Sequence, residues 1–238
     1  MMLTMPDNLI ELREKYHIKH VPFYKSCSLK ALAIHMCLHS KHVGFVKEAL
    51  AAVYNRCDND LVKEYVLENL AEEAGKQSPD GAPEDHGNMI TAFCRDQDID
   101  EGEFNRIKDE WFTAGWWARG LHYRSVAERD NFDTVFAHFW IQESQLVEWN
   151  EEVLIPRLLE CGYDRDDDTI RWFTSHGRND VTHSQKWVEL YHHYAGGYRS
   201  VNELHIHNVC KTGLQLRLDS LREVQGHLAK EKTWQEDH

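Results

Sequence analysis

The protein has 238 residues, 42% of them hydrophobic, and a formal net charge of −13 at pH 7, which suits a single domain over residues 1–238 with a substantial core. The acidic balance, without clusters of Lys and Arg, disfavours a nucleic-acid or anionic-membrane partner and favours a small-molecule substrate. The N-terminus lacks the features of a secretory signal and no apolar run reaches the roughly 18 residues of a membrane span, so we expect a cytoplasmic protein.

Helical periodicity dominates the chain, and few segments alternate as strands do. We expect helices at residues 8–17, 28–55, 59–75, 87–95, 101–122, 128–160, 167–194 and 199–230. The clearest interruption is the loop at 75–86, where Gly75 can end a helix. The pattern predicts an all-α bundle in which residues 1–20 and 227–238 are peripheral or frayed. The six cysteines form no Cys-x-x-Cys pair and are expected to be reduced core residues.

The helix expected over residues 28–55 carries three histidines on one face, His35, His39 and His42. Positions i, i+4 and i+7 return to nearly the same side of a helix. Three imidazoles can bind zinc, which is one interpretation of this run. Because no carboxylate accompanies them, a zinc site is the less favoured interpretation.

Two carboxylates occupy helix faces that are otherwise apolar. In the helix at 59–75, Glu73 follows Val62 and Val66, whereas Glu72 lies over Glu68, so Glu73 is expected to point inward and Glu72 outward. In the helix at 128–160, Glu143 shares its surroundings with several aromatic residues. Buried carboxylates are usually paired, so a salt bridge from Glu143 to Arg171 or Arg178 is the ordinary alternative to a functional role.

The segment at 176–183 places His176, Asp180 and His183 on one helix face, within an apolar stripe that includes Trp172 and Trp187. Unpaired charges would be unfavourable there, and a metal ion would remove that penalty. With Glu73, Glu143 and His86, these residues make three carboxylates and three imidazoles, a suitable ligand set for two metal ions. Nitrogen and oxygen ligands without thiolate suit Fe(2+) or Mn(2+), and iron is the ion that activates dioxygen.

An ordered set of motifs resembles the haem-oxygenase-like di-iron oxidases and oxygenases, relatives of pyrroloquinoline quinone synthase and of TenA-like proteins. The set runs over residues 35–195 and consists of His42-Val-Gly-Phe, Arg56-Cys-Asp, Glu68-Asn-Leu-Ala-Glu-Glu-Ala-Gly, His86, Gln142-Glu-Ser-Gln before Ile155-Pro, and His176-x3-Asp180-x2-His183. The ferritin-like bundle is a poorer match, because it needs two Glu-x-x-His pairs and this chain has only Glu14-x-x-His17.

The resemblance implies a bundle of seven to eight helices around a cavity that holds two Fe(2+) ions per chain, the second of them labile. Its implied ligands are Glu73, His86, Glu143, His176, Asp180 and His183, with Glu143 the first candidate for a bridging carboxylate, Glu73 the next and Asp180 a ligand or bridge. His42 is the implied substrate contact. The step of thirteen positions from Glu73 to His86 is longer than the family pattern leads us to expect, which makes His86 the least secure ligand.

The implied activity is the oxidation of a small organic substrate by dioxygen, with an external electron donor for turnover, in a homodimer. N-oxygenation, desaturation and C–C cleavage all fit such a centre, and an amino-acid-like substrate is favoured over a fatty-acid-like one. Two alternatives remain open. One is a metal-free relative, either a cofactorless oxidase or a thiaminase-like hydrolase, and the other is a non-catalytic binding protein.

Overall fold

The computed structural model describes residues 3–73, 86–194 and 202–236, without the side chains of residues 178–180 and 230–236. Helices account for the regular structure of these described parts, and no strand occurs among them. The fold is therefore all-α, as the periodicity predicts. The helices are α1 (Asp7–Ser26), α2 (Leu29–Arg56), α3 (Asp60–Glu73), α4 (His86–Asp96), α5 (Glu101–Glu110), α6 (Ala114–Arg129), α7 (Phe132–Glu148), a π-helical segment η1 (Trp149–Leu154), α8 (Ile155–Glu160), a 3-10 turn η2 (Asp168–Ile170), α9 (Arg171–Tyr194) and α10 (Glu203–Glu236).

The first helix differs most from the sequence-based expectation. It continues past residue 17, through Pro22, to Ser26. It is also not peripheral, because Leu9, Leu12 and Tyr16 are buried as part of the core, where α1 packs against α7 and α10. These apolar side chains recur at three- and four-residue intervals, which is the spacing that lays one face of a helix on a core.

The segment expected as one helix over residues 101–122 is broken between Trp111 and Thr113. Glu223 of α10 reaches this break, where its carboxylate accepts hydrogen bonds from the Thr113 hydroxyl and from the backbone N–H of Gly115. A carboxylate is favourable at the first turn of a helix, where N–H groups lack intrahelical partners. The break is thus stabilised by a contact more than a hundred residues away along the chain.

The expected helix at 128–160 contains a π-helical segment just before Pro156. Proline has no N–H and disturbs the preceding turn, and a wider π turn is one way to absorb the disturbance. Trp149 and Asn150 lie in this segment, and both are buried. The irregular turn therefore changes which side chains α7 directs into the interior.

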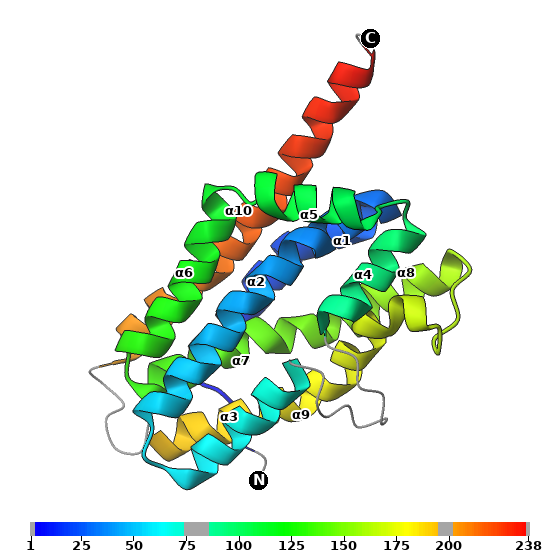
Figure 1. Ribbon diagram of the computed structural model, residues 1–238. Helices are drawn as coiled ribbons and strands as arrows, with labels where there is room; N and C mark the ends of the chain where they lie inside the picture. The colour runs from blue at the N-terminus through cyan, green and yellow to red at the C-terminus, as the bar shows by residue number, and fades with distance from the viewer. Residues whose placement is uncertain (1–2, 74–85, 195–201, 237–238) are drawn as a thin grey trace.

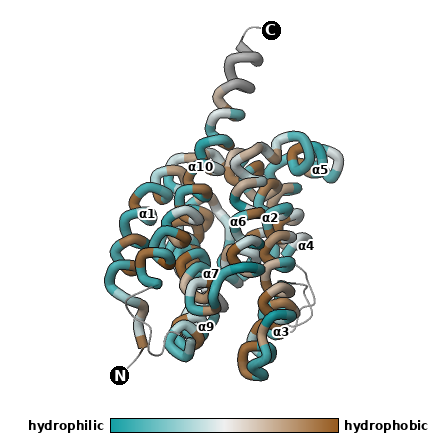
Figure 2. Tube along the Cα trace, turned by 90° about the vertical axis from the view of Figure 1, so that its left-hand side faces the viewer, coloured by the Kyte–Doolittle hydropathy of each residue, from teal (hydrophilic) through white to brown (hydrophobic). Residues whose placement is uncertain are grey.

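The helices enclose two hydrophobic clusters at different levels of one bundle (Figure 1). Along α2, residues up to Leu38 join one cluster and residues from Ala49 join the other. The same division recurs along α7, α9 and α10. Figure 2 shows the apolar positions on the sides of the helices that face one another. Polar side chains in the middle of these helices consequently meet at the level between the two clusters.

The C-terminal part of α10 extends beyond the bundle in Figure 1. Among the described residues, no helix is long and apolar enough to cross a membrane.

Candidate metal centre

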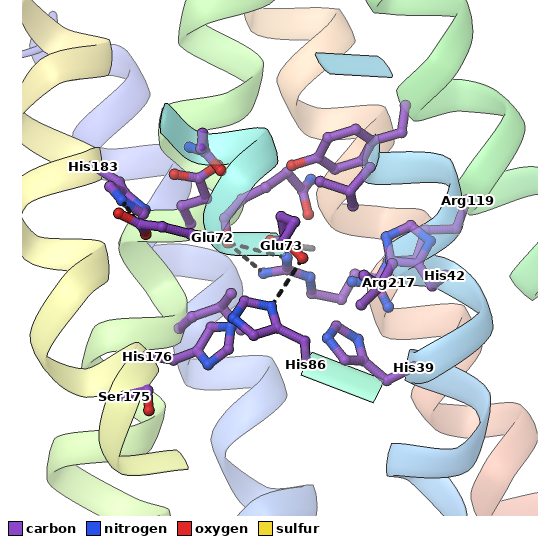
Figure 3. A pocket seen from close by; sticks show the side chains of 17 residues that line it. His39, His42, Glu72, Glu73, His86, Arg119, Ser175, His176, His183 and Arg217 are labelled. Atoms are coloured by element: carbon purple, nitrogen blue, oxygen red, sulfur yellow. Dashed lines mark hydrogen bonds and ion pairs between the residues drawn. The ribbon is translucent and has the colours of Figure 1, made fainter. Parts of the chain in front are cut away.

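A cavity lies between the two hydrophobic clusters and collects the acids and imidazoles singled out from the sequence. Its lining includes Glu72, Glu73, His86, Glu143, His176 and His183. These six come from α3, α4, α7 and α9, which are far apart in the chain. Figure 3 shows Glu72, His176 and His183 on one side of the cavity, with Glu73 and His86 near its middle. The fold thus brings together five of the six expected ligands and adds Glu72.

Glu73 and His86 form an ion pair across the residues that join α3 to α4. His86 Nδ1 lies 2.9 Å from Glu73 Oε2. Burial alone would raise the pKa of the Glu73 carboxyl. The charge and hydrogen bond of His86, with the charges of His176 and Lys47, outweigh burial and lower the pKa to about 2. Glu73 is therefore ionised at neutral pH, which is the state that a metal ligand requires.

His176 is held in a fixed orientation on α9. Its Nδ1 lies 2.7 Å from the backbone oxygen of Trp172, and its ring stacks on the Trp172 indole at 4.1 Å between centroids. Because a carbonyl oxygen can only accept, Nδ1 carries a proton, and in the neutral ring Nε2 carries the lone pair. Such a backbone hydrogen bond commonly orients a metal-binding histidine. The ring of His86 lies 4.6 Å from that of His176, so the two imidazoles face the same region.

His183 pairs with Glu72, a residue that helical spacing placed on the outer face of α3. Nε2 of His183 lies 2.9 Å from Glu72 Oε2, and Glu72 also lines the cavity. The expectation that Glu72 points outward is therefore wrong. The last turn of α3 approaches α9 closely enough for both Glu72 and Glu73 to reach the cavity, and Glu68, one turn earlier, pairs instead with Lys186 at 2.9 Å.

Glu143 lies on α7, half-buried, at the aromatic face that its sequence neighbours indicate. The indole Nε1 of Trp187 donates a hydrogen bond of 2.5 Å to Glu143 Oε2. Trp187 is fully buried and belongs to the hydrophobic cluster next to the cavity. A tryptophan N–H in such a place normally finds an acceptor, and here it orients the carboxylate. The remaining expected ligand, Asp180, lies on α9 with its side chain outside the described residues.

The donor set fits iron by its chemistry, since carboxylates and neutral imidazoles are the ligands of non-haem iron sites. As the side chains stand, no three His, Cys, Asp or Glu residues of the described parts converge closely enough to hold a metal ion. The acids are instead paired with other side chains, two of them with histidines. Metal binding would replace these acid–imidazole pairs with bonds to the ion, and deprotonated ligands favour that exchange.

The opposite side of the cavity contains two arginines that the sequence did not single out. Beyond His42, which was expected to contact substrate, the wall includes His39, Asn69, Arg119, Gln142 and Arg217. The two arginines lie in helices whose sequences give no periodic signal of function. Only the bundle geometry reveals them, because α6 and α10 carry them to the same level as the acid cluster (Figure 3).

The three histidines of α2 sit in this wall and below it. His35 is buried among Phe23, Tyr24 and Trp116, and burial with nearby Arg119 lowers its pKa to about 3. The pKa values of His39 and His42 are also lowered well below the ordinary range, mainly by burial and then by Arg119. These rings are neutral at pH 7, and His39 and His42 line the cavity as neutral groups.

Residues 32–202 match the model of a family described as iron-containing redox enzymes. The chain belongs to this iron-containing redox enzyme family. The matched span contains every helix that contributes an acid or imidazole to the cavity. Membership confirms the resemblance stated above and the haem-oxygenase-like all-α architecture.

A solved structure has the same fold as this member of the iron-containing redox enzyme family. The crystal structure of a TenA homolog from Pseudomonas syringae pv. tomato str. DC3000 superposes with a TM-score of 0.74. The similarity covers 95% of this chain and 99% of that one, at 11% sequence identity. At that identity the likeness concerns the fold alone. No curated protein matches the sequence.

Proposed function

We propose that the protein is a non-haem di-iron enzyme that activates dioxygen to oxidise a small organic molecule, either amino-acid-like or fatty-acid-like. The observation that carries the proposal is one cavity in which Glu72, Glu73, Glu143, His86, His176 and His183 come together from four helices. Iron chemistry in the family is consistent with it. Burying acids and imidazoles between two hydrophobic clusters lowers the stability of the fold unless these groups are well paired, and bound metal ions would provide that pairing.

The residues that would hold the metals are Glu73, His86, Glu143, His176 and His183, with Asp180 from the same turn of α9 as His183 and Glu72 as a further carboxylate. Bound iron would supply the electron transfer to dioxygen that no protein side chain can perform. The protein's own groups prepare the site. The low pKa of Glu73 keeps it ionised, the Trp172 carbonyl fixes the His176 ring, and Trp187 orients Glu143.

A thiaminase-like hydrolase is the principal alternative on this fold. Such an enzyme needs a nucleophilic cysteine in the cavity. All six cysteines belong to the described residues, and none of them lines the cavity. The pKa of Cys27, Cys94 and Cys210 is raised, chiefly by burial for Cys27 and Cys210 and by the neighbouring Cys37 thiol for Cys94, so these thiols are poor nucleophiles. These observations favour the iron enzyme over the hydrolase.

Anaerobic titration with Fe(2+) tests the proposal. We expect the wild-type protein to bind two Fe(2+) per chain and to give a transient visible absorption when oxygen is admitted. Glu143→Ala and His183→Ala should each reduce iron uptake, because each removes a ligand. The matched controls are Glu68→Ala on α3 and His193→Ala on α9, an acid and an imidazole at exposed positions, which should leave uptake unchanged. Unchanged uptake in both ligand variants would rule out this assignment.

A further inference from the structure

Two arginines are buried at the cavity, on the side away from the acid–histidine pairs. Arg119 of α6 is 4% exposed and Arg217 of α10 is 3% exposed. Arg217 donates to the backbone oxygen of Gln142 from both terminal nitrogens, at 3.0 Å. Within the described parts of the chain, Arg119 Nε and Nη1 are buried and have no hydrogen-bond partner. An arginine is rarely buried without an acceptor, so this one calls for an explanation.

The charge balance around Arg119 is unfavourable in the protein alone. Burial lowers its pKa to about 9, and the positive charge of Arg217 contributes to that shift. Glu72 and Glu73 of the same cavity are engaged with His183 and His86 (Figure 3). Glu143, which also lines the cavity, acts on Arg217 and is not among the groups that shift the pKa of Arg119. A buried charge without a counterion is strongly destabilising. An anionic ligand beside Arg119 would remove that penalty.

Arg119 also borders a second, smaller cavity, so it stands where the two cavities meet. The walls of the smaller cavity are mostly aromatic and aliphatic, and its described lining contains no Asp or Glu. The lining comprises Tyr24, Leu32, His35, Met36, His39, Arg119, Leu146, Trp149, Asn150, Leu154 and Trp172. The chemistry of these walls suits a short apolar group, and side chains must move apart to admit it, because the cavity itself holds little more than a water molecule. An ammonium group would find no carboxylate there.

We propose that Arg119, supported by Arg217, binds the carboxylate of an organic acid whose apolar part enters the smaller cavity. The carboxylate then lies in the same cavity as the candidate metal ligands, at the opposite wall, and is held by the protein, not by the metals. The carbon atoms next to the carboxylate are the ones nearest to the metal cavity. Guanidinium groups bind carboxylates through charge-assisted hydrogen bonds, the stronger kind in proteins. This inference rests on the proposed function only in naming the organic acid as the substrate.

The test measures binding to metal-free protein by isothermal titration calorimetry at pH 7.5. The probes are hexanoate, its neutral counterpart hexanamide, and inorganic phosphate. We expect hexanoate to bind the wild-type protein at least 10-fold more tightly than hexanamide does. Arg119→Met should weaken hexanoate at least 10-fold and leave hexanamide unchanged. Equal binding of hexanoate and hexanamide, full hexanoate affinity in Arg119→Met, or tighter binding of phosphate than of hexanoate would each overturn the proposal.

Thermal unfolding separates ligand binding from a structural role. Removing an uncompensated charge should raise the Tm of ligand-free Arg119→Met by a few degrees. Arg157→Met is the control, because Arg157 donates hydrogen bonds to the backbone oxygens of Tyr24 and Cys27, and its loss should lower the Tm without affecting hexanoate binding. A lower Tm in Arg119→Met with undiminished hexanoate binding would assign Arg119 to structure.

The wild-type protein supplies a readout that does not depend on any variant folding. Hexanoate should raise its Tm, and hexanamide at the same concentration should not; equal shifts contradict the proposal. Since no iron is present, failure here leaves the iron titration standing, and failure of the iron titration leaves this binding result standing.

Discussion

The buried histidines make the fold sensitive to mild acid. His20, His35, His42 and His138 are each at most 5% exposed. Burial lowers the pKa of all four, and the charges of Arg119 and Arg217 lower them further; that of His35 falls to about 3. Each ring is neutral in the folded protein and takes up a proton on unfolding near its ordinary pKa of about 6.5. Their contribution to stability is complete above that pH and is lost as the pH falls below it.

The size of this effect follows from proton linkage. One such histidine removes about 1.4 kcal/mol of stability per pH unit below 6.5, or about 2 kcal/mol at pH 5. Four of them remove about 8 kcal/mol, which is comparable to the ~5–15 kcal/mol of a whole domain. Glu73 contributes little to the loss in this range, because the loss of its stabilisation begins only near its ordinary pKa of 4.5 and runs down to its folded-state pKa of about 2. We therefore expect acid unfolding of the metal-free protein near pH 5.

Urea unfolding followed by circular dichroism at pH 7.5, 6.5, 6.0 and 5.5 measures the loss directly. His138→Leu removes one of the four groups and should reduce the slope of unfolding free energy against pH by about one proton. His193→Gln alters an exposed histidine of α9 and should leave the slope unchanged. Equal stability of the wild-type protein at pH 7.5 and 5.5 would refute the argument that burial keeps these rings neutral.

Three further outcomes are expected. Gly213→Ala places a methyl group 2.7 Å from side-chain atoms of Gln142 and His138, so it should lower the free energy of unfolding in urea by about 1–3 kcal/mol. Gly44→Ala, in open space on α2, should raise that free energy by about 0.5–1 kcal/mol. The reverse order would contradict the packing of α10 on α7. At pH 7, Glu73→Gln should destabilise the metal-free protein by about 3 kcal/mol, because the pKa of Glu73 is shifted from 4.5 to about 2. Glu68→Gln breaks an exposed pair with Lys186 and should destabilise it by less than about 1 kcal/mol. Equal losses would show that the Glu73–His86 pair is weak. A thiol reagent should modify Cys161 rapidly and Cys37, Cys57, Cys94 and Cys210 only after unfolding, and rapid modification of the buried four would contradict their packing.

Periodicity located the long helices well because their apolar faces repeat without interruption. The expected helix at 28–55 is α2, Leu29–Arg56, and the expected helix at 167–194 contains α9, Arg171–Tyr194. Breaks that depend on distant contacts were not visible. The interruption before Ala114 is stabilised by Glu223, and the local sequence, in which Gly115 already lies inside the next helix, does not reveal that contact.

The candidate site was predictable in part for the same reason. His176 and His183 share one helix face, and Glu143 and Glu73 are acids on apolar faces, so the spacing of residues alone singles them out. Glu72 was misplaced because helical geometry fixes relative directions on α3 but not how closely α9 approaches it. Arg119 and Arg217 were missed because exposed and buried arginines look alike in a sequence. Their burial follows only from the meeting of α6, α7 and α10.

Anomalous diffraction at the iron absorption edge, from crystals loaded anaerobically with Fe(2+), tests the central claim most directly. The account predicts iron peaks in the cavity, within bonding distance of Glu73, His86, Glu143, His176 and His183. Peaks at the His35–His39–His42 face of α2 instead, or no peak in the cavity of protein that has taken up iron, would contradict it.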